Sequence, residues 1–309
     1  MLPFARDVRA GLGQSGQKYL SCEYFYDEVG SALFEVITLL PEYGLTRADA
    51  RLVRRLATEL GGYLHAPAVV AELGSGTGTK TRFVLEALAA GGPIAYYPID
   101  LSRSALAHCA RELAAFAEVH PIEETYLNGL RQAVCRRRSG QAMLVLFLGS
   151  TIGNFERAAA QDFLRDIRAC LMPGDALLLG ADLIKPLPGM LLAYDDPAGV
   201  TAAFNLNLLA RINRELDADF VLKRFAHEAR WNPYQRRVEM HLRSLAPQTA
   251  FIRAAGLECE FLEDETIWTE SCHKFQAGEI GEMAAAAGFE CAAQWTDEDW
   301  PFAESLLIA

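Results

Sequence analysis

A glycine-rich turn at residues 74–80, with the sequence GSGTGTK, constrains the fold of this chain more than any other feature. The apolar segment 68–73 precedes the turn and predicts a short buried strand, and residues 81–90 follow it with a helical pattern. Glycines let a backbone approach a ligand closely, and the first turn of a helix offers unpaired N–H groups. The segment is therefore typical of a strand–turn–helix ligand site.

The alternation of strands and helices continues to about residue 184. Apolar runs at 94–101, 143–148 and 176–181 predict further strands, and helical patterns follow at 102–116 and 157–171. An amphipathic helix capped by Thr46 is expected at 47–64, before the first strand. Continuous apolar strands separated by helices predict an open, mostly parallel α/β sheet with helices on both faces.

Residues 185–274 break this alternation, with two longer helical patterns and strand-like runs that include 237–245 and 256–262. The alternation resumes with a helix at 278–288 and a strand at 289–295, which would suit the far edge of the sheet. We therefore expect one domain from residues 49–184 plus 275–309, and a smaller α+β domain from residues 1–48 plus 185–274.

Composition excludes several classes of protein. The 309 residues carry a formal net charge of −11, which disfavours a general nucleic-acid binder. The seven cysteines are scattered without a CxxC pair, which argues against structural zinc and against a disulfide framework. No apolar run is long enough to span a bilayer, and the opening residues lack a basic stretch followed by an apolar one, so we expect no secretory signal. We expect a cytoplasmic protein that acts on a small molecule, without a metal, a membrane or a nucleic acid as partner.

The spacing of the glycines distinguishes between the classes of ligand that this turn could bind. A dinucleotide fingerprint requires G-x-G-x-x-G, whereas the turn here reads G-x-G-x-G after Glu72, a spacing used by S-adenosylmethionine (SAM) enzymes. Asp100 ends the next predicted strand, and a carboxylate there can accept hydrogen bonds from both ribose hydroxyls of an adenosyl cofactor. A phosphate-binding P-loop does not fit, because no G-K-[ST] closes the turn. The remaining alternative is a turn needed only for strand–helix packing.

Four longer motifs carry a resemblance to a known family. They are SCEYFYDEVGS at 21–31, LPEYGLTR at 40–47, ELGSGTGTKT at 72–81 and FLGSTIGNF at 147–155. With these motifs the chain resembles the histidine-specific methyltransferase family over nearly its whole length. The resemblance implies a Rossmann-like class I methyltransferase sheet with a smaller substrate-binding domain. It also implies a monomer that uses SAM, releases S-adenosyl-L-homocysteine, and converts L-histidine to Nα,Nα,Nα-trimethylhistidine (hercynine), the first step of ergothioneine biosynthesis.

The resemblance assigns site residues position by position. The implied cofactor contacts are Tyr26, Phe34, Gly74, Lys80, Asp100, Asn128 and Gly149. The implied substrate contacts are Tyr43, Asn154, Tyr194, Thr201, Met240, Glu270 and Cys272, of which Tyr43, Asn154 and Tyr194 are the implied catalytic residues. Glu270 is expected to face the imidazole of the substrate. Cys272 stands where the family has a serine, and its weaker hydrogen bonding predicts altered imidazole recognition.

Other interpretations of the same residues stay open at this point. Asn154 follows an apolar strand, where a helix N-cap is the usual role, and Met240 alternates with apolar neighbours as a core residue does. Glu270 could be a solvent-facing strand residue. The whole chain could methylate another aromatic amino acid or a modified histidine, or bind SAM or an amino acid as a non-catalytic regulator. Retention of Tyr43, Asn154, Tyr194 and Glu270 together argues against the regulator.

Overall fold

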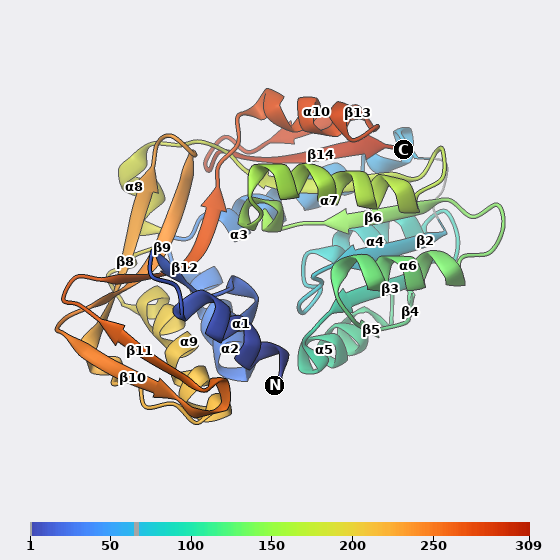
Figure 1. The fold of residues 1–309 in the computed structure, drawn as a ribbon. Helices are drawn as coiled ribbons and strands as arrows, with labels where there is room; N and C mark the ends of the chain where they lie inside the picture. The colour runs from blue at the N-terminus through green and yellow to red at the C-terminus, as the bar shows by residue number, and fades with distance from the viewer. Residues whose placement is uncertain (1, 65–67) are drawn as a thin grey trace. The chain divides into compact units, whose positions relative to one another are not determined.

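The computed structural model describes residues 2–64 and 68–309, and the chain divides into two compact units. Unit 1 comprises Met1–Gly44 and Lys185–His273, and unit 2 comprises Leu45–Ile184 and Lys274–Ala309. The order of the elements along the chain can be followed in Figure 1. Within the part of the chain that the structure describes, no helix is both long and apolar enough to cross a membrane.

Unit 2 contains an eight-stranded sheet in the order β13-β14-β7-β6-β2-β3-β4, with β5 also paired to β3. The strands are β2 (Val69–Leu73), β3 (Ala95–Asp100), β4 (Glu118–Val119), β5 (Ile122–Glu123), β6 (Met143–Phe147), β7 (Ala176–Asp182), β13 (Glu290–Thr296) and β14 (Phe302–Ile308). All pairs from β7 to β4 and β5 are parallel, whereas β14 runs antiparallel to both β7 and β13. This is the mostly parallel α/β sheet that the sequence predicts.

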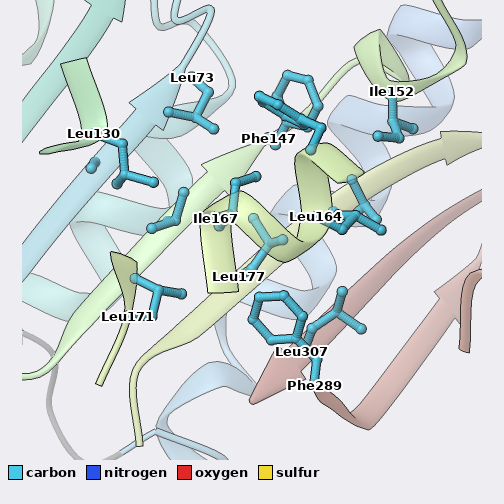
Figure 2. Close-up of a cluster of buried hydrophobic side chains, with 14 of the residues drawn as sticks. Leu73, Leu130, Phe147, Ile152, Leu164, Ile167, Leu171, Leu177, Phe289 and Leu307 are labelled. Carbon is cyan, nitrogen blue, oxygen red and sulfur yellow. The ribbon is translucent and has the colours of Figure 1, made fainter. Parts of the chain in front are cut away.

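Helices cover both faces of this sheet. They are α3 (Leu45–Ala57), α4 (Thr81–Ala89), α5 (Arg103–Leu113), α6 (Tyr126–Arg136), α7 (Arg157–Cys170) and α10 (Ala277–Ala286), with the 3₁₀ turns η2 (Leu60–Gly62) and η3 (Thr151–Asn154). Side chains alternate along a strand. Leu73 therefore joins the large apolar cluster beneath α6, α7 and α10, drawn in Figure 2, whereas Glu72 points to the other face and bonds to α4.

The sequence analysis of unit 2 misses one strand and misplaces the ends of one helix. Strand β14 was not predicted, although it lies between β7 and β13. Helix α3 begins at Leu45 and ends at Ala57, rather than running from 47 to 64 under a Thr46 cap. Leu45 and Ala48 are buried on the same face as the rest of α3, so residues 45–48 belong to unit 2 and the predicted boundary at 48/49 cuts through one continuous helix.

Unit 1 is built around a smaller sheet in the order β1-β12-β9-β8 and a separate hairpin of β10 and β11. The strands are β1 (Lys18–Tyr19), β8 (Phe225–Asn232), β9 (Arg237–Ser244), β10 (Gln248–Ile252), β11 (Leu257–Phe261) and β12 (Thr266–His273). The helices are α1 (Pro3–Leu12), α2 (Glu28–Leu39), α8 (Leu187–Leu192) and α9 (Val200–Leu216), with the 3₁₀ turns η1 (Cys22–Phe25), η4 (Leu222–Arg224) and η5 (Arg253–Ala255). Of the two longer helices predicted in 185–274, α9 is long and α8 is a six-residue helix.

Candidate functional site

The glycine turn of unit 2 adopts left-handed backbone conformations. Gly74, Gly76 and Gly78 have φ values of 73°, 51° and 72°, which residues other than glycine rarely adopt. A Cβ at Gly78 would come within 2.7 Å of Cys109 Sγ on α5, so this glycine also serves packing. A Cβ at Gly76 would meet nothing within 4 Å. Packing therefore accounts for Gly78 but leaves the backbone at Gly76 open to a ligand.

Asp100 connects the turn to the end of β3. Its Oδ2 accepts a hydrogen bond from the backbone N–H of Gly76 at 3.0 Å, and its Oδ1 accepts one from the N–H of Ser102 at 2.8 Å. A carboxylate offers about four lone-pair sites, so both oxygens retain acceptor capacity. The carboxylate of Asp100, which is predicted to bind the ribose of the cofactor, is thus held beside the glycine turn in a fixed orientation.

Lys80 and Gly149, two of the implied cofactor residues, lie close together. The Lys80 ammonium pairs with the fully buried carboxylate of Asp49 on α3, and a Cβ at Gly149 would lie 3.7 Å from Lys80 Nζ. Burial acts to lower the pKa of Lys80, but the charge and hydrogen bond of Asp49, together with the nearby carboxyl groups of Glu304 and Glu72, raise that pKa above its ordinary value. Burial and the charge of Asp49 raise the pKa of Glu304 on β14 well above its ordinary value. Lys80 is therefore charged at neutral pH, and it lies near a Glu304 carboxyl group whose protonated form is favoured by burial.

Glu72 ties the two flanks of the turn together. Its buried carboxylate accepts hydrogen bonds from Thr81 Oγ1 at 2.8 and 2.7 Å and from the Tyr96 hydroxyl. Burial raises the pKa of Glu72 to about 7, against the opposing effect of these hydrogen bonds. Through Glu72 the end of β2 is bonded to the first turn of α4 and to β3, which fixes the geometry of the turn.

Asp49 and Glu304 were not found by sequence reasoning, although the sequence holds a signal for each. Asp49 is the one acidic residue among the buried positions of α3, which otherwise present the apolar side chains Leu45, Ala48, Leu52, Val53, Leu56 and Ala57. Glu304 interrupts the apolar strand Phe302–Ile308. A carboxylate on the apolar face of an element is costly unless it is paired, so both positions could have been singled out.

Asn128 and Asn154 sit differently from the other predicted residues of unit 2. Asn128 is exposed on α6, and its Oδ1 accepts a hydrogen bond from Arg131 Nη1 at 3.3 Å, so its adenine contact stays a prediction. The following Gly129 has a clear packing role, because a Cβ there would come within 2.3 Å of an Ile99 methyl group. Asn154 is half-buried at the end of η3 and is not the N-cap of α7, which is Glu156.

In unit 1, four implied site residues form a continuous series of edge-to-face aromatic contacts. The ring centroids of Tyr26 and Phe34 are 5.6 Å apart, those of Phe34 and Tyr43 6.3 Å, and those of Tyr43 and Tyr194 6.5 Å. Phe204 on α9, which sequence reasoning missed, contacts both Tyr26 and Phe34. Tyr26 is 46% exposed, whereas Tyr43 and Tyr194 are 8% and 7% exposed. Ring faces attract cations, so this aromatic cluster suits a positively charged ligand.

Glu270 and Met240 are directly opposite each other on the antiparallel strands β12 and β9, so their side chains share one face of the sheet. Cys272 lies two residues further along β12 and is half-buried. The charge of Glu270 also acts on Cys22: burial and this charge raise the pKa of the Cys22 thiol to about 12. The structure thus assembles a carboxylate, a thioether and thiols on one side of unit 1.

Thr201 is buried at the start of α9, where its backbone N–H donates to Asp196 Oδ1 at 2.7 Å. Asp196 also accepts from the N–H of Val200 at 3.0 Å, so its carboxylate fixes the first turn of this helix. Across residues 2–64 and 68–309, no group of three or more His, Cys, Asp or Glu side chains is arranged to hold a metal ion.

Comparison with known proteins gives matches over almost the whole chain. A family model described as "Histidine-specific methyltransferase, SAM-dependent" matches residues 4–309. The chain is 42% identical over 307 residues to a histidine N-alpha-methyltransferase of Mycobacterium tuberculosis (strain CDC 1551 / Oshkosh), covering 99% of this chain and 94% of that protein. It is 41% identical over 305 residues to the protein of the same name from Mycolicibacterium smegmatis, covering 98% and 94%. Ergothioneine biosynthesis protein 1 of Neurospora crassa is 36% identical over 203 residues, which cover 65% of this chain and 23% of that protein.

Proposed function

Because the chain belongs to the family of SAM-dependent, histidine-specific methyltransferases, we propose that it methylates the α-amino nitrogen of L-histidine. The product is Nα,Nα,Nα-trimethylhistidine, and the reaction opens ergothioneine biosynthesis. The observation that carries this proposal is the aromatic cluster of Tyr26, Phe34, Tyr43 and Tyr194. Each transfer replaces an N–H donor with a methyl group, and the final trimethylammonium has no N–H left. Aromatic faces still attract such a cation after its hydrogen bonds are lost.

The geometry of the predicted cofactor residues in unit 2 supports SAM as their ligand. Asp100 retains free lone pairs beside the turn and would accept hydrogen bonds from the two ribose hydroxyls, while the open backbone at Gly76 would leave room for the cofactor. Lys80 would attract the cofactor carboxylate, and the backbone at Gly149 would bind the cofactor amino group. When bound, SAM supplies an electrophilic methyl group whose bond to sulfur breaks as the amine attacks.

The predicted substrate residues orient the amine and recognise the side chain of the amino acid. Asn154 binds the amino and carboxylate groups of the amino acid, because its amide has both a donor and an acceptor. The Tyr43 and Tyr194 hydroxyls direct the nitrogen lone pair, since a displacement requires nitrogen, methyl carbon and sulfur in line. The substrate ammonium loses its proton before each transfer. Glu270 accepts a hydrogen bond from the imidazole N–H and thereby selects histidine.

The substrate is tested by incubating the purified chain with SAM and, separately, histidine, tryptophan or tyrosine, and identifying products by mass spectrometry. We expect histidine to gain three methyl groups and the other amino acids to gain few or none. Methylation of tryptophan or tyrosine in preference to histidine would overturn the histidine assignment. Binding of SAM with no methylated product from any amino acid would instead support a non-catalytic regulator.

Replacing Asp100 with alanine is expected to weaken SAM binding by about 2 kcal/mol, which is about 30-fold in Kd, because two hydrogen bonds to a charged group are lost. Isothermal titration calorimetry measures the change. Glu123→Ala is the matched control, since Glu123 pairs in register with Asp100 on the neighbouring strand β5 but is exposed. Unchanged affinity in a folded Asp100→Ala variant contradicts the ribose assignment.

We also propose that the protein acts as a monomer in a reducing, cytoplasmic environment. The net charge of −11 and the seven free cysteines support this proposal. Light scattering coupled to gel filtration checks the oligomeric state, and a dimer mass would contradict it.

A further inference from the structure

A buried histidine connects helix α9 to the backbone of Tyr194 through a chain of hydrogen bonds in unit 1. His227 lies on β8 with its side chain 2% exposed. Its Nδ1 is 2.9 Å from Asn205 Nδ2, and its Nε2 is 2.7 Å from the carbonyl oxygen of Tyr194. Asn205, which is fully buried on α9, also reaches the carbonyl oxygen of His241 at 3.1 Å through the same Nδ2.

The partners in this chain assign the tautomer of His227. The His241 carbonyl can only accept, so the Asn205 atom that faces it must be the NH₂ group. The same NH₂ group faces Nδ1 of His227, which therefore accepts. The ring proton of the neutral imidazole then resides on Nε2 and is donated to the Tyr194 carbonyl.

The hydrogen bond from His227 reaches the backbone of Tyr194 just after the C-terminal end of helix α8. The backbone N–H of Tyr194 donates to the Leu191 carbonyl at 2.9 Å, and its carbonyl accepts from His227, so both sides of the residue are held. The ring that this backbone carries packs edge-to-face against Tyr43. We propose that the Nε2–H tautomer of His227 is a positioning group that sets the Tyr194 ring for the substrate amine; this inference rests on the proposed function.

The surroundings of His227 keep it neutral. Asp195 and Asp196 follow α8, Glu228 is its neighbour on β8, Asn205 faces it from α9, and its register partner on β9 is the apolar Leu242. Burial lowers the pKa of His227 and outweighs the Tyr194 carbonyl and the three carboxylates, which act to raise it.

Protonation of His227 would break the chain, because it places a hydrogen on Nδ1, opposite the NH₂ group of Asn205 at 2.9 Å. The folded protein binds this second ring proton less tightly than an exposed imidazole does, so the neutral form persists below the ordinary histidine pKa of about 6.5. Positioning is therefore intact at neutral pH and is lost as pH falls through the lowered pKa.

The test compares His227→Gln, His227→Phe and the wild type over roughly pH 5 to 8, the range in which histidines titrate. Glutamine keeps an N–H donor for the Tyr194 carbonyl but does not titrate, whereas phenylalanine fills the space without a donor. At pH 8 we expect His227→Gln to keep most of the wild-type kcat and His227→Phe to lose about tenfold, as for one lost hydrogen bond in the transition state. KM for SAM should not change in either variant.

The pH dependence is read from the ratio of kcat for His227→Gln to kcat for the wild type. Steps common to both proteins, including loss of the substrate ammonium proton, cancel in this ratio. The wild type alone loses the positioning hydrogen bond when His227 is protonated, so the ratio should rise as pH falls. His241→Gln is the matched control, because burial also lowers the pKa of His241 but its side chain lies outside the chain to Tyr194. Its ratio to the wild type should stay flat.

Nitrogen-15 NMR of the imidazole gives a reading that does not depend on substrate or on any variant folding. We expect a protonated Nε2 and an unprotonated, hydrogen-bonded Nδ1 for His227 in the full chain. A proton on Nδ1 at neutral pH, a flat His227→Gln ratio, or an unchanged kcat in a folded His227→Phe variant would overturn the inference. Absence of histidine methylation in the wild type would overturn the proposed function instead.

Discussion

Replacing Lys274 with methionine is expected to lower the stability of unit 2 by about 3–5 kcal/mol, because it removes one charge of a buried ion pair. Lys274 Nζ lies 2.7 Å from Asp182 Oδ2, and the two side chains are 1% and 2% exposed. The pair lies where the chain leaves unit 2 after β7 and where it returns. The Phe275 N–H donates to the Asp182 carbonyl at 3.0 Å, and the Ile184 N–H donates to the Phe275 carbonyl at 3.0 Å. Urea unfolding followed by fluorescence measures the loss.

The control is the double variant with Lys274→Met and Asp182→Asn. Asp182 Oδ1 also accepts a hydrogen bond from Trp300 Nε1 at 3.2 Å, and an asparagine oxygen can still accept it. Because the double variant removes both charges of the pair, we expect it to recover most of the stability lost by Lys274→Met. If both variants unfold at the same urea concentration, the loss comes from packing around Lys274 and not from the charge of Asp182.

The central strands of unit 2 could be predicted because they are local, continuous apolar runs that need no distant partner to be recognised. Strand β14 could not, because Glu304 and Ser305 interrupt its apolar pattern, yet both are fully buried. The buried space for the Glu304 side chain comes from a neighbouring strand. A Cβ at Gly180 on β7 would lie only 2.7 Å from the Glu304 carboxyl oxygen, so the glycine provides this space. Burial and the charge of Asp49, which lies on helix α3, raise the pKa of Glu304.

The same distinction separates the parts of the candidate site. The glycine turn and Asp100 are recognisable from spacing, since one strand–turn–helix segment and the next strand end create the arrangement. The aromatic cluster draws on segments that are far apart in sequence, and only the family motifs mark most of its members in advance. Phe204 belongs to it through packing against Phe25, Tyr26 and Phe34, which no local pattern reveals.

Glu270→Ala is expected to lower kcat/KM for histidine by about 10- to 150-fold, while kcat/KM for tryptophan stays constant or rises. A charge-assisted hydrogen bond to the imidazole N–H contributes about 1.5–3 kcal/mol, and its loss gives this range. Alanine leaves an uncharged space opposite Met240. A larger apolar ring can occupy this space without desolvating a carboxylate. Steady-state kinetics with both amino acids measures the two values.

Matched variants separate the imidazole contact from a structural role. Glu258→Ala removes an exposed carboxylate from β11 of the same unit and should change neither substrate. Cys272→Ser restores a hydroxyl two residues from Glu270 and should leave histidine turnover equal or raise it, since a hydroxyl hydrogen-bonds better than a thiol.

The ratio of the two specificity constants decides the role of Glu270, because any general weakening of unit 1 lowers both by the same factor. Glu270 also acts on its surroundings, since its charge contributes to the raised pKa of Cys22. Removing that charge should therefore make Cys22 react faster with a thiol reagent whether or not histidine binds there. If Cys22 becomes more reactive and kcat/KM falls by the same factor for histidine and tryptophan, Glu270 supports the local fold, and histidine selection must come from other residues. If kcat/KM falls only for histidine, the carboxylate recognises the imidazole.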